Sequence, residues 1–284
     1  MHRIKRLLCL TTAALVMRAE KKKKGVFEMI TITGWRKAGM AVGLLCVGLF
    51  ACEGNAQAKQ ESDPTAGNVV GLAFVEVQAG SFMRESSQVT LTKPFWMAKT
   101  EVTQRQYQQL MGSNLSRFKG DNLPVDNVSW CDAMEFCRKL TEMERKAGRL
   151  PEGYEYTLPT EAQWEYACRA GTTGDYAGNL DAMGWYKSNA GEKTHPVGTK
   201  QPNAWGLYDM HGNVWEWCLD VYDPGFYGKS TGVDPVNTDS GSLPVIRGGC
   251  WDDGASNCRS ADRDWYNPCV TFDILGFRAC LVRK

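Results

Sequence analysis

The chain has 284 residues, a formal net charge of +1, 43% hydrophobic residues and ten tryptophans. So small a net charge excludes a strong electrostatic attraction to nucleic acid, and nucleic acid is therefore not an expected partner. The length fits a single domain of about 230 residues behind a leader that is removed. Eleven cysteines without a C-x-x-C pair or zinc-ligand spacing favour disulfides in an oxidising compartment over metal binding in the cytosol.

Residues 1–52 have the pattern of a leader rather than of a folded domain. The basic stretch W-R-K precedes an apolar run over residues 38–51, as in a signal peptide, and the run is too short for a comfortable transmembrane span. It ends in L-F-A-C, which resembles a bacterial lipobox. We therefore expect Cys52 to be lipidated and to anchor the chain in the cell envelope, at the outer membrane, in the periplasm or on the cell surface. Ordinary signal cleavage after Ala58 is the alternative.

Two further N-terminal stretches flank this run. Residues 1–28 contain a second basic and apolar run, and because two tandem signals are not expected, we interpret these residues as an artefact of gene assignment, with translation starting at Met29. Residues 53–68 are polar and rich in small side chains, which predicts a flexible tether. The folded domain is expected over residues 69–284.

The domain opens with two predicted strands. Residues 74–82 alternate between apolar and polar side chains and include a turn at Gly80, which predicts a strand that enters a hairpin. Residues 95–102 are predicted to form the second strand. Three short strands are expected near the C-terminus, over residues 214–217, 245–248 and 276–282.

Three helices are predicted from the residues that would cap them. Thr103 with Gln106 and Thr160 with Gln163 match the pattern of a capping box, and Ser129 can cap the helix between them. Beyond the third helix the helical periodicity disappears, and Gly, Asn, Asp and Pro become frequent. Early helices followed by long loops indicate an α+β fold with few short helices and antiparallel strands.

The tryptophan segment, G-L-Y-D-M-H-G-N-V-W-E-W-C-L-D over residues 206–220, is the most distinctive stretch. In a strand, Trp215 and Trp217 share one side while Glu216 points to the other. Asp209 and Glu216 flank a tight G-N turn, and hard oxygen ligands around a turn suit a calcium ion. A buried tryptophan strand with a solvated glutamate is the alternative.

Five phrases together resemble the formylglycine-generating enzyme, or sulfatase-modifying factor, family. They are T-E-V-T-Q at 100–104, P-V-D-N-V-S-W at 124–130, L-P-T-E-A-Q-W-E-Y-A-C-R-A-G at 158–171, the tryptophan segment, and R-G-G followed by a late G-F-R. The resemblance implies a loop-rich, modified C-type-lectin fold. It also implies calcium as a cofactor, held by Asp209, Gly212, Val214 and Glu216.

The best-known members of this family oxidise a cysteine of sulfatases to formylglycine with copper(I) held by two cysteines, since soft thiolates select copper(I). By position Cys258 matches the second cysteine, but the first falls near Asp253, and Cys250 stands eight positions before Cys258. The catalytic pair is therefore not reproduced at the family spacing, which favours an atypical or non-catalytic member. The alternative is a copper-dependent oxidase or maturation factor that uses Cys250 and Cys258 on a cysteine-containing protein or a periplasmic substrate.

The resemblance also implies two disulfides. Cysteines at the positions of Cys137 and Cys168 bond in the family to the C-terminal region, where this chain offers Cys280 and Cys258 within one or two positions. We therefore predict Cys137–Cys280 and Cys168–Cys258 bridges. A Cys258 locked in such a bridge cannot hold copper.

Between the R-G-G and G-F-R phrases lies a mixture of aromatic and short polar side chains, which binding surfaces favour. It resembles the diversified C-terminal segment of surface lipoproteins with the same fold, which bind different ligands. The predicted partner is a protein or a small molecule, and ordinary loop packing on the two tryptophans is the alternative. The predicted ligand-binding residues are Trp251, Asp252, Asp253, Asn257, Asp264, Trp265, Tyr266 and Phe272.

Overall fold

The computed structural model describes residues 67–239 and 243–284. The predicted leader, the lipidation site Cys52 and nearly all of the tether lie outside the described residues. The described part of the chain combines short helices with mostly antiparallel strands, joined by long loops, which confirms the α+β expectation. Within these ranges, no helix combines the length and apolar character that crossing a membrane requires.

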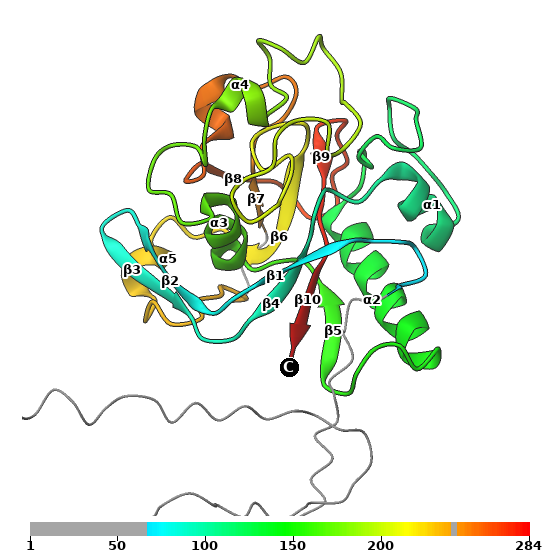
Figure 1. Cartoon of the computed structure of the whole chain (residues 1–284), viewed down its shortest axis with the longest axis horizontal. Helices are drawn as coiled ribbons and strands as arrows, with labels where there is room; N and C mark the ends of the chain where they lie inside the picture. Colours follow the sequence, from blue (N-terminus) through cyan, green and yellow to red (C-terminus); the bar gives the residue numbers. More distant parts are fainter. Residues whose placement is uncertain (1–66, 240–242) are drawn as a thin grey trace, which may run out of the picture. The chain divides into compact units, whose positions relative to one another are not determined.

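A four-stranded antiparallel sheet carries the C-terminal strand in its interior. Its strands, in spatial order, are β1 (Phe74–Val77), β4 (Phe95–Ala98), β10 (Cys280–Arg283) and β5 (Tyr154–Thr157). The last strand of the chain therefore lies between β4 and β5, which both come much earlier in the sequence (Figure 1). The sheet is covered on both faces, since Trp96 and Ala98 of β4 pack into one core cluster and Phe95 and Met97 into another.

A second four-stranded sheet carries the tryptophan segment. Its strands, in spatial order, are β8 (Arg263–Trp265), β7 (Pro244–Arg247), β6 (Trp215–Val221) and β9 (Leu275–Gly276), of which β6 and β9 run parallel. The prediction of one strand over 276–282 is wrong in extent, because the chain crosses from this sheet to the first one there. The carbonyl of Phe277 accepts a hydrogen bond from Val102, and that of Ala279 accepts one from Ala98.

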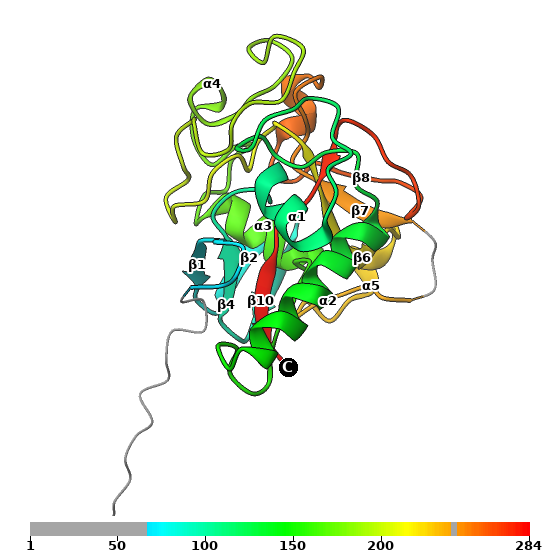
Figure 2. The same cartoon turned by 90° about the vertical axis from the view of Figure 1, so that its right-hand side faces the viewer.

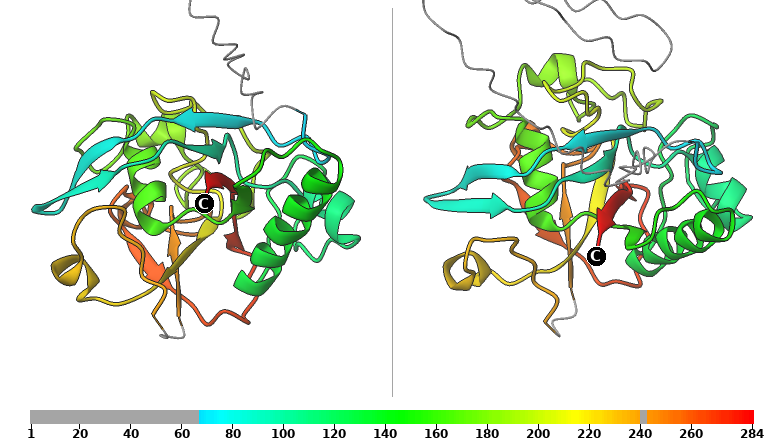
Figure 3. Two further views of the ribbon diagram at one scale, coloured as in Figure 1. Left: turned by 90° about the horizontal axis from the view of Figure 1, so that it is seen from below. Right: turned by 60° about the horizontal axis from the view of Figure 1, so that its bottom comes forward.

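The predicted N-terminal strand is divided as well. Residues 78 and 79 separate β1, which joins the first sheet, from β2 (Gly80–Arg84), which pairs with β3 (Ser87–Leu91) in a two-stranded hairpin. This hairpin extends beside helix α3 at one side of the domain (Figure 3). The predicted hairpin is therefore present, but β1 does not take part in it.

The three main helices begin where the capping residues predict. They are α1 (Gln104–Met111), α2 (Trp130–Lys146) and α3 (Glu161–Arg169), and each follows a complete capping box whose N-cap is Thr103, Ser129 or Thr160. In each box the N-cap side chain accepts a hydrogen bond from the third helical residue, which satisfies a backbone N–H that the helix leaves unpaired. The shorter helices are α4 (Leu180–Met183), α5 (Phe226–Lys229) and the 3-10 helix η1 (Ala255–Cys258).

Helices α2 and α3 lie on opposite sides of the first sheet, α2 nearest the viewer in Figure 2. The cluster on the α2 side includes Phe136 and both tryptophans of β6, Trp215 and Trp217. The cluster on the α3 side contains Trp164 and Phe95. The tryptophan segment therefore belongs to the hydrophobic core that α2 covers.

A buried ion cluster joins α3 to the hairpin and to the second sheet. Glu165, which is 1% exposed, lies 3.0 Å from Nε of Arg84 on β2 and 2.5 Å from Nη2 of Arg247 on β7. It also lies 2.8 Å from Nη2 of Arg169 on its own helix. Removing one partner from a buried ion cluster is costly, because the remaining charges stay buried without compensation.

We therefore predict that Glu165→Gln lowers the free energy of unfolding by about 3–5 kcal/mol, since three arginines lose a shared counter-charge. Urea unfolding followed by tryptophan fluorescence measures this loss. The matched control is Glu142→Gln on the exposed face of α2, where Glu142 pairs with Arg138 in solvent, and it should leave the midpoint unchanged. Equal midpoints for the two variants would contradict the prediction.

Candidate functional site

The turn of the tryptophan segment is as tight as the sequence predicts. Gly212 has a φ of 118°, and a Cβ at this position would lie 2.1 Å from the carbonyl oxygen of Trp185. Asn213, with a φ of 66°, accepts a hydrogen bond from the backbone N–H of His195 at 2.9 Å and donates to its carbonyl at 3.2 Å. The side chain of Asn213 thus fastens the loop around His195 to the turn.

The two indoles and the carboxylate of the tryptophan segment point to opposite sides, as predicted. Both tryptophans lie in the same core cluster, where Trp217 donates to the carbonyl of Val128 and Trp215 to the carboxylate of Asp253. Glu216 points the other way. The alternative of a solvated glutamate is wrong, because Glu216 is only 1% exposed.

Glu216 is held by a buried arginine. Its oxygens lie 2.6 Å from Nε and 2.6 Å from Nη2 of Arg278, and Oε2 also accepts a hydrogen bond from Trp164 Nε1 at 2.7 Å. Arg278 donates further to the carbonyls of Ala98 at 3.0 Å and Tyr208 at 2.9 Å. A single guanidinium therefore ties the first sheet, the tryptophan segment and the C-terminal crossing together.

Two more carboxyls lie beside this pair. Burial raises the pKa of Glu101, and the charges of Asp209 and Glu216 raise it further. Burial also raises the pKa of Asp209 to about 6, although its Oδ2 accepts a hydrogen bond from Gly198 N at 2.6 Å. Both oxygens of Glu101 and Oδ1 of Asp209 are buried without a hydrogen-bond partner among the described residues, and we interpret Glu101 as protonated because its pKa is raised. Arg278 is thus the positive charge that interacts with three carboxyls, those of Glu101, Asp209 and Glu216, and we interpret Glu101 as the neutral one.

This arrangement does not fit a calcium ion bound by Glu216. Both of its oxygens face a guanidinium that already supplies positive charge, and an ion would have to displace Arg278 or share the carboxylate with it. One oxygen of Asp209 accepts the Gly198 N–H, while the other is buried without a hydrogen-bond partner. Among the described residues, no group of three or more His, Cys, Asp or Glu side chains is placed to hold a metal ion. The calcium set Asp209, Gly212, Val214 and Glu216 therefore stays a prediction without support from the side-chain geometry.

The predicted catalytic cysteines are buried and protonated. Burial raises the pKa of Cys258 to about 12, with Asp253 and Asp262 adding to the effect. Burial also raises the pKa of Cys250 strongly, and Asp253 again contributes. The Cys250 thiol donates to Asp253 Oδ2 at 3.0 Å. A copper(I) site of the family type needs two thiolates, and the residues present do not fit it, because a carboxylate, Asp253, stands near the first position and already accepts a hydrogen bond from the Cys250 thiol.

The predicted disulfides are not formed in the structure, where the eight cysteines of the described ranges all carry free thiols. Cys168 donates to the hydroxyl of Ser260 at 3.5 Å, and the Cys168–Cys258 bridge stays a prediction. Cys137 lies close enough to Cys280 to raise the pKa of its thiol, after the larger effect of burial. The Cys137–Cys280 bridge therefore stays a prediction that the arrangement favours.

The predicted ligand-binding residues separate into buried and exposed groups. Trp251 is buried and Asp253 is occupied by Trp215 and Cys250, so both support the loop from inside. Asn257 belongs to η1, and Asp252 is exposed in an ion pair with Lys187. Ligand contact by Trp251 or Asp253 would require this loop to open.

The remaining aromatic residues predicted to bind a ligand, Trp265, Tyr266 and Phe272, lie at two separate places in the fold. Trp265 follows Asp264 at the edge of the second sheet and packs against Tyr222, with ring centroids 6.0 Å apart. Tyr266 and Phe272 contact each other at 5.3 Å, and Phe272 is 43% exposed. The structure therefore brings Tyr266 and Phe272 together and sets Trp265 against a different neighbour.

Phe118, which the sequence analysis did not single out, lies on the same side of the Trp251 loop. Phe118 packs edge-on against Trp251 at 5.6 Å, and the indole of Trp251 donates to the carbonyl of Asp273, beside Phe272. We call Phe118, Tyr266 and Phe272 the aromatic surface. Arg117 flanks it, since its guanidinium lies 5.1 Å from the centroid of Phe118 and pairs with the Asp273 carboxylate. In the sequence, only the adjacent arginine and phenylalanine at 117 and 118 indicated this site.

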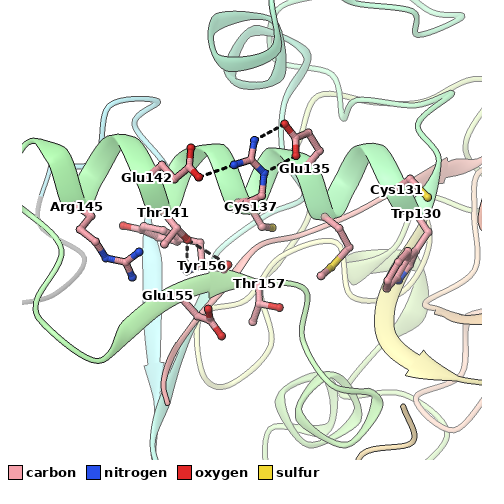
Figure 4. Close-up of a pocket in the computed structure, with 12 residues that line it drawn as sticks. Trp130, Cys131, Glu135, Cys137, Thr141, Glu142, Arg145, Glu155, Tyr156 and Thr157 are labelled. Carbon is pink, nitrogen blue, oxygen red and sulfur yellow. Dashed lines mark hydrogen bonds and ion pairs between the residues drawn. The ribbon is translucent and has the colours of Figure 1, made fainter. Parts of the chain in front are cut away.

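A groove of about 530 Å³ lies away from these residues, between α2 and β5 (Figure 4). Thr141 crosses its floor and exchanges hydrogen bonds with the backbone of Tyr156. The residues that line it, all in the described part of the chain, include none of those predicted to bind calcium or ligand. The groove reaches the first turn of α2, where Cys131 lies.

We predict that Glu216→Gln destabilises the fold by about 3–5 kcal/mol, because Arg278 is left buried without its counter-charge. Thermal unfolding measured in calcium and in a chelator should show the same loss in both conditions. Glu135→Gln, in an exposed pair with Arg138, serves as the control with no expected change. A wild-type midpoint that rises with calcium, and a rise that Glu216→Gln abolishes, would instead establish the calcium site.

Comparison with known proteins places this geometry in a family. Residues 56–283 match the sulfatase-modifying factor enzyme 1-like domain. The chaperone protein LppX of Paenibacillus barcinonensis is 36% identical over 240 residues, which cover 66% of this chain and 81% of that protein. The formylglycine-generating enzyme of Streptomyces coelicolor is 36% identical over 177 residues, which cover 55% of this chain and 52% of the enzyme. The chain thus spans about half the length of that enzyme.

Solved structures confirm the expected fold. Treponema denticola variable protein 1 superposes with a TM-score of 0.63 at 29% identity, over 74% of this chain and 94% of that chain. PvdO from Pseudomonas aeruginosa superposes with a TM-score of 0.63 at 26% identity, over 73% and 93%. Both share the loop-rich, C-type-lectin-like architecture that the five phrases predicted. The chain therefore belongs to the family of sulfatase-modifying factor enzyme 1-like domains.

Proposed function

We propose that this protein is a lipid-anchored, non-catalytic member of the family in the bacterial cell envelope, and that it binds a protein partner through the aromatic surface. The observation that carries the proposal is the position of Asp253. By the family resemblance it stands near the position of the first copper-binding cysteine, and its carboxylate already accepts hydrogen bonds from the indole of Trp215 and the thiol of Cys250. The residue there supports the loop and offers no thiolate.

The aromatic surface has the composition of a protein interface. Aromatic and arginine side chains are enriched at the energetically dominant positions of such interfaces. The exposed ring of Phe272 contacts Tyr266, which is half-buried against the core, and Asp273, the next residue after Phe272, pairs with Arg117. The buried Trp251 fixes the loop beneath through its hydrogen bond to Asp273, which limits the entropy lost on binding.

The relatives support a binding role and an envelope location. LppX is named a chaperone protein, and the match covers 81% of its length, against 52% for the Streptomyces formylglycine-generating enzyme. A chaperone binds another protein without necessarily changing it covalently. Together with the lipobox-like sequence at Cys52, this similarity favours a lipoprotein that acts on protein partners outside the cytoplasm.

A photoreactive phenylalanine analogue at position 272 tests the surface directly. We predict that it crosslinks in cells to one defined protein, and that Tyr266→Ala weakens the affinity of the purified pair at least about tenfold, because Tyr266 packs directly on this ring. Met83→Ala, an exposed apolar side chain on β2, is the matched control and should leave the affinity unchanged.

Two results would refute the proposed function. One is an affinity that Tyr266→Ala leaves unchanged. The other is formation of formylglycine in a sulfatase peptide by the purified chain with copper(I), with loss of that activity in Cys258→Ser. The second result would establish the oxidase alternative, with Cys250 and Cys258 as the metal ligands.

The anchor has its own test. We predict that Cys52→Ser moves the protein from the membrane fraction to the soluble fraction and abolishes incorporation of a labelled fatty acid, because acylation requires the thiol of Cys52. Immunoblotting of fractionated cells and fluorography measure the two effects. A Cys52→Ser protein that still carries the label, or a wild type that is already soluble, would contradict the lipid anchor.

A further inference from the structure

Cys131 and Cys269 are the exposed cysteines among the eight that the described residues contain. Cys131 is the second residue of α2, after the N-cap Ser129. Cys269 lies in the long connection between β8 and β9, three residues before Phe272 of the aromatic surface. None of the disulfides that the family resemblance implies involves either of them.

Backbone contacts hold the two cysteines beside each other. The N–H of Trp130 donates to the carbonyl of Pro268 at 3.1 Å, so the residues immediately before the two cysteines are bonded. A second contact, from Asn127 N to the carbonyl of Phe272 at 3.0 Å, aligns the same two segments. The Cys269 backbone is itself fixed by a hydrogen bond to Asn267 Oδ1 at 3.0 Å. Backbone hydrogen bonds between residues 127–130 and 268–272 therefore hold Cys131 and Cys269 near each other.

The two thiols also lie close enough to interact. Burial raises the pKa of the Cys131 thiol, and the neighbouring Cys269 raises it further. Both side chains are open to solvent, in contrast to the buried cysteines of the core. An accessible pair of adjacent thiols is the arrangement that thiol–disulfide exchange requires, whereas a buried thiol cannot meet the attacking disulfide.

We propose that Cys131 and Cys269 form a disulfide that fastens the aromatic surface to α2. A thiolate of the pair attacks a small-molecule or protein disulfide, RSSR, and releases one RSH to give a mixed disulfide. The second thiolate then displaces the other RSH and closes the Cys131–Cys269 bond. The pair loses two protons and two electrons, and RSSR gains them as two RSH.

The bond would act on the loop that carries Tyr266 and Phe272. Hydrogen bonds to Asn127 and Trp130 attach this loop to the body of the domain, and Tyr266 and Val270 pack against the core. A covalent link at Cys269 limits local opening of the loop and pre-organises both aromatic rings. The effect on partner binding rests on the proposed function, while the disulfide itself does not.

The experiment uses the purified full chain treated with oxidised or reduced glutathione. Peptide mapping without reduction should show a Cys131–Cys269 crosslink whose peptide is lighter by about 2 Da than the two thiol peptides together. The oxidised form should unfold about 10 °C higher than the reduced form, since the bond closes a long loop. Hydrogen exchange over residues 265–273 should slow at least tenfold on oxidation.

Cys131→Ser and Cys269→Ser provide the matched controls, because both side chains are exposed and their replacement leaves the core intact. Each variant should lose the crosslink and show the same hydrogen exchange in both redox states. Oxidation that leaves both thiols free, or that pairs either one with a different cysteine, would overturn the proposal. A crosslink that forms but leaves exchange of residues 265–273 unchanged would overturn the fastening of the surface.

If the crosslink forms and slows exchange while Tyr266→Ala does not affect partner affinity, the disulfide stands and the proposed function fails. If affinity depends on Tyr266 but glutathione yields no crosslink, the proposed function stands and the disulfide fails. The two proposals can therefore be distinguished by measurements on the same set of variants.

Discussion

The fold depends on the buried pair between Glu216 and Arg278. This pair joins strand β6 to the chain that crosses into β10, and Arg278 also bonds the carbonyls of Ala98 and Tyr208. A guanidinium with five donors can satisfy acceptors from several segments at once, which a hydrophobic side chain cannot do. Four segments that are distant in sequence thus meet at one charge, and replacing either partner would leave the other buried without compensation.

A second cluster of buried ion pairs joins α3 to the surrounding strands. Arg263 on β8 forms a bidentate ion pair with Glu161, in which both hydrogen bonds are 2.7 Å long. Glu165, one turn further along, gathers Arg84, Arg169 and Arg247. In a domain with so many long loops, few backbone hydrogen-bond ladders between strands fix the orientation of one segment against another. Directional, charge-assisted hydrogen bonds of the arginines supply that orientation.

The same burial that stabilises the core governs the chemistry of the cysteines. Cys250 and Cys258 lie in the interior, where desolvation keeps the thiols neutral, and Asp253 makes ionisation less favourable still. Cys131 and Cys269 lie at the surface, where exchange with an external disulfide is open to them. Asp253 and Cys250 thus hold each other in the interior, while two exposed thiols lie on α2 and on the loop that carries Tyr266 and Phe272.

The sequence by itself determined the features that depend on neighbours along the chain. These are the capping boxes at Thr103 and Thr160, the opposite orientation of Glu216 and its flanking indoles, and the fold, through five local phrases. Only the tertiary structure decided which distant groups meet. It paired Glu216 with Arg278, placed Cys168 beside Ser260, and packed Phe118 against Trp251. Such encounters depend on how the crossing chain closes two sheets, and no local pattern of residues encodes that closure.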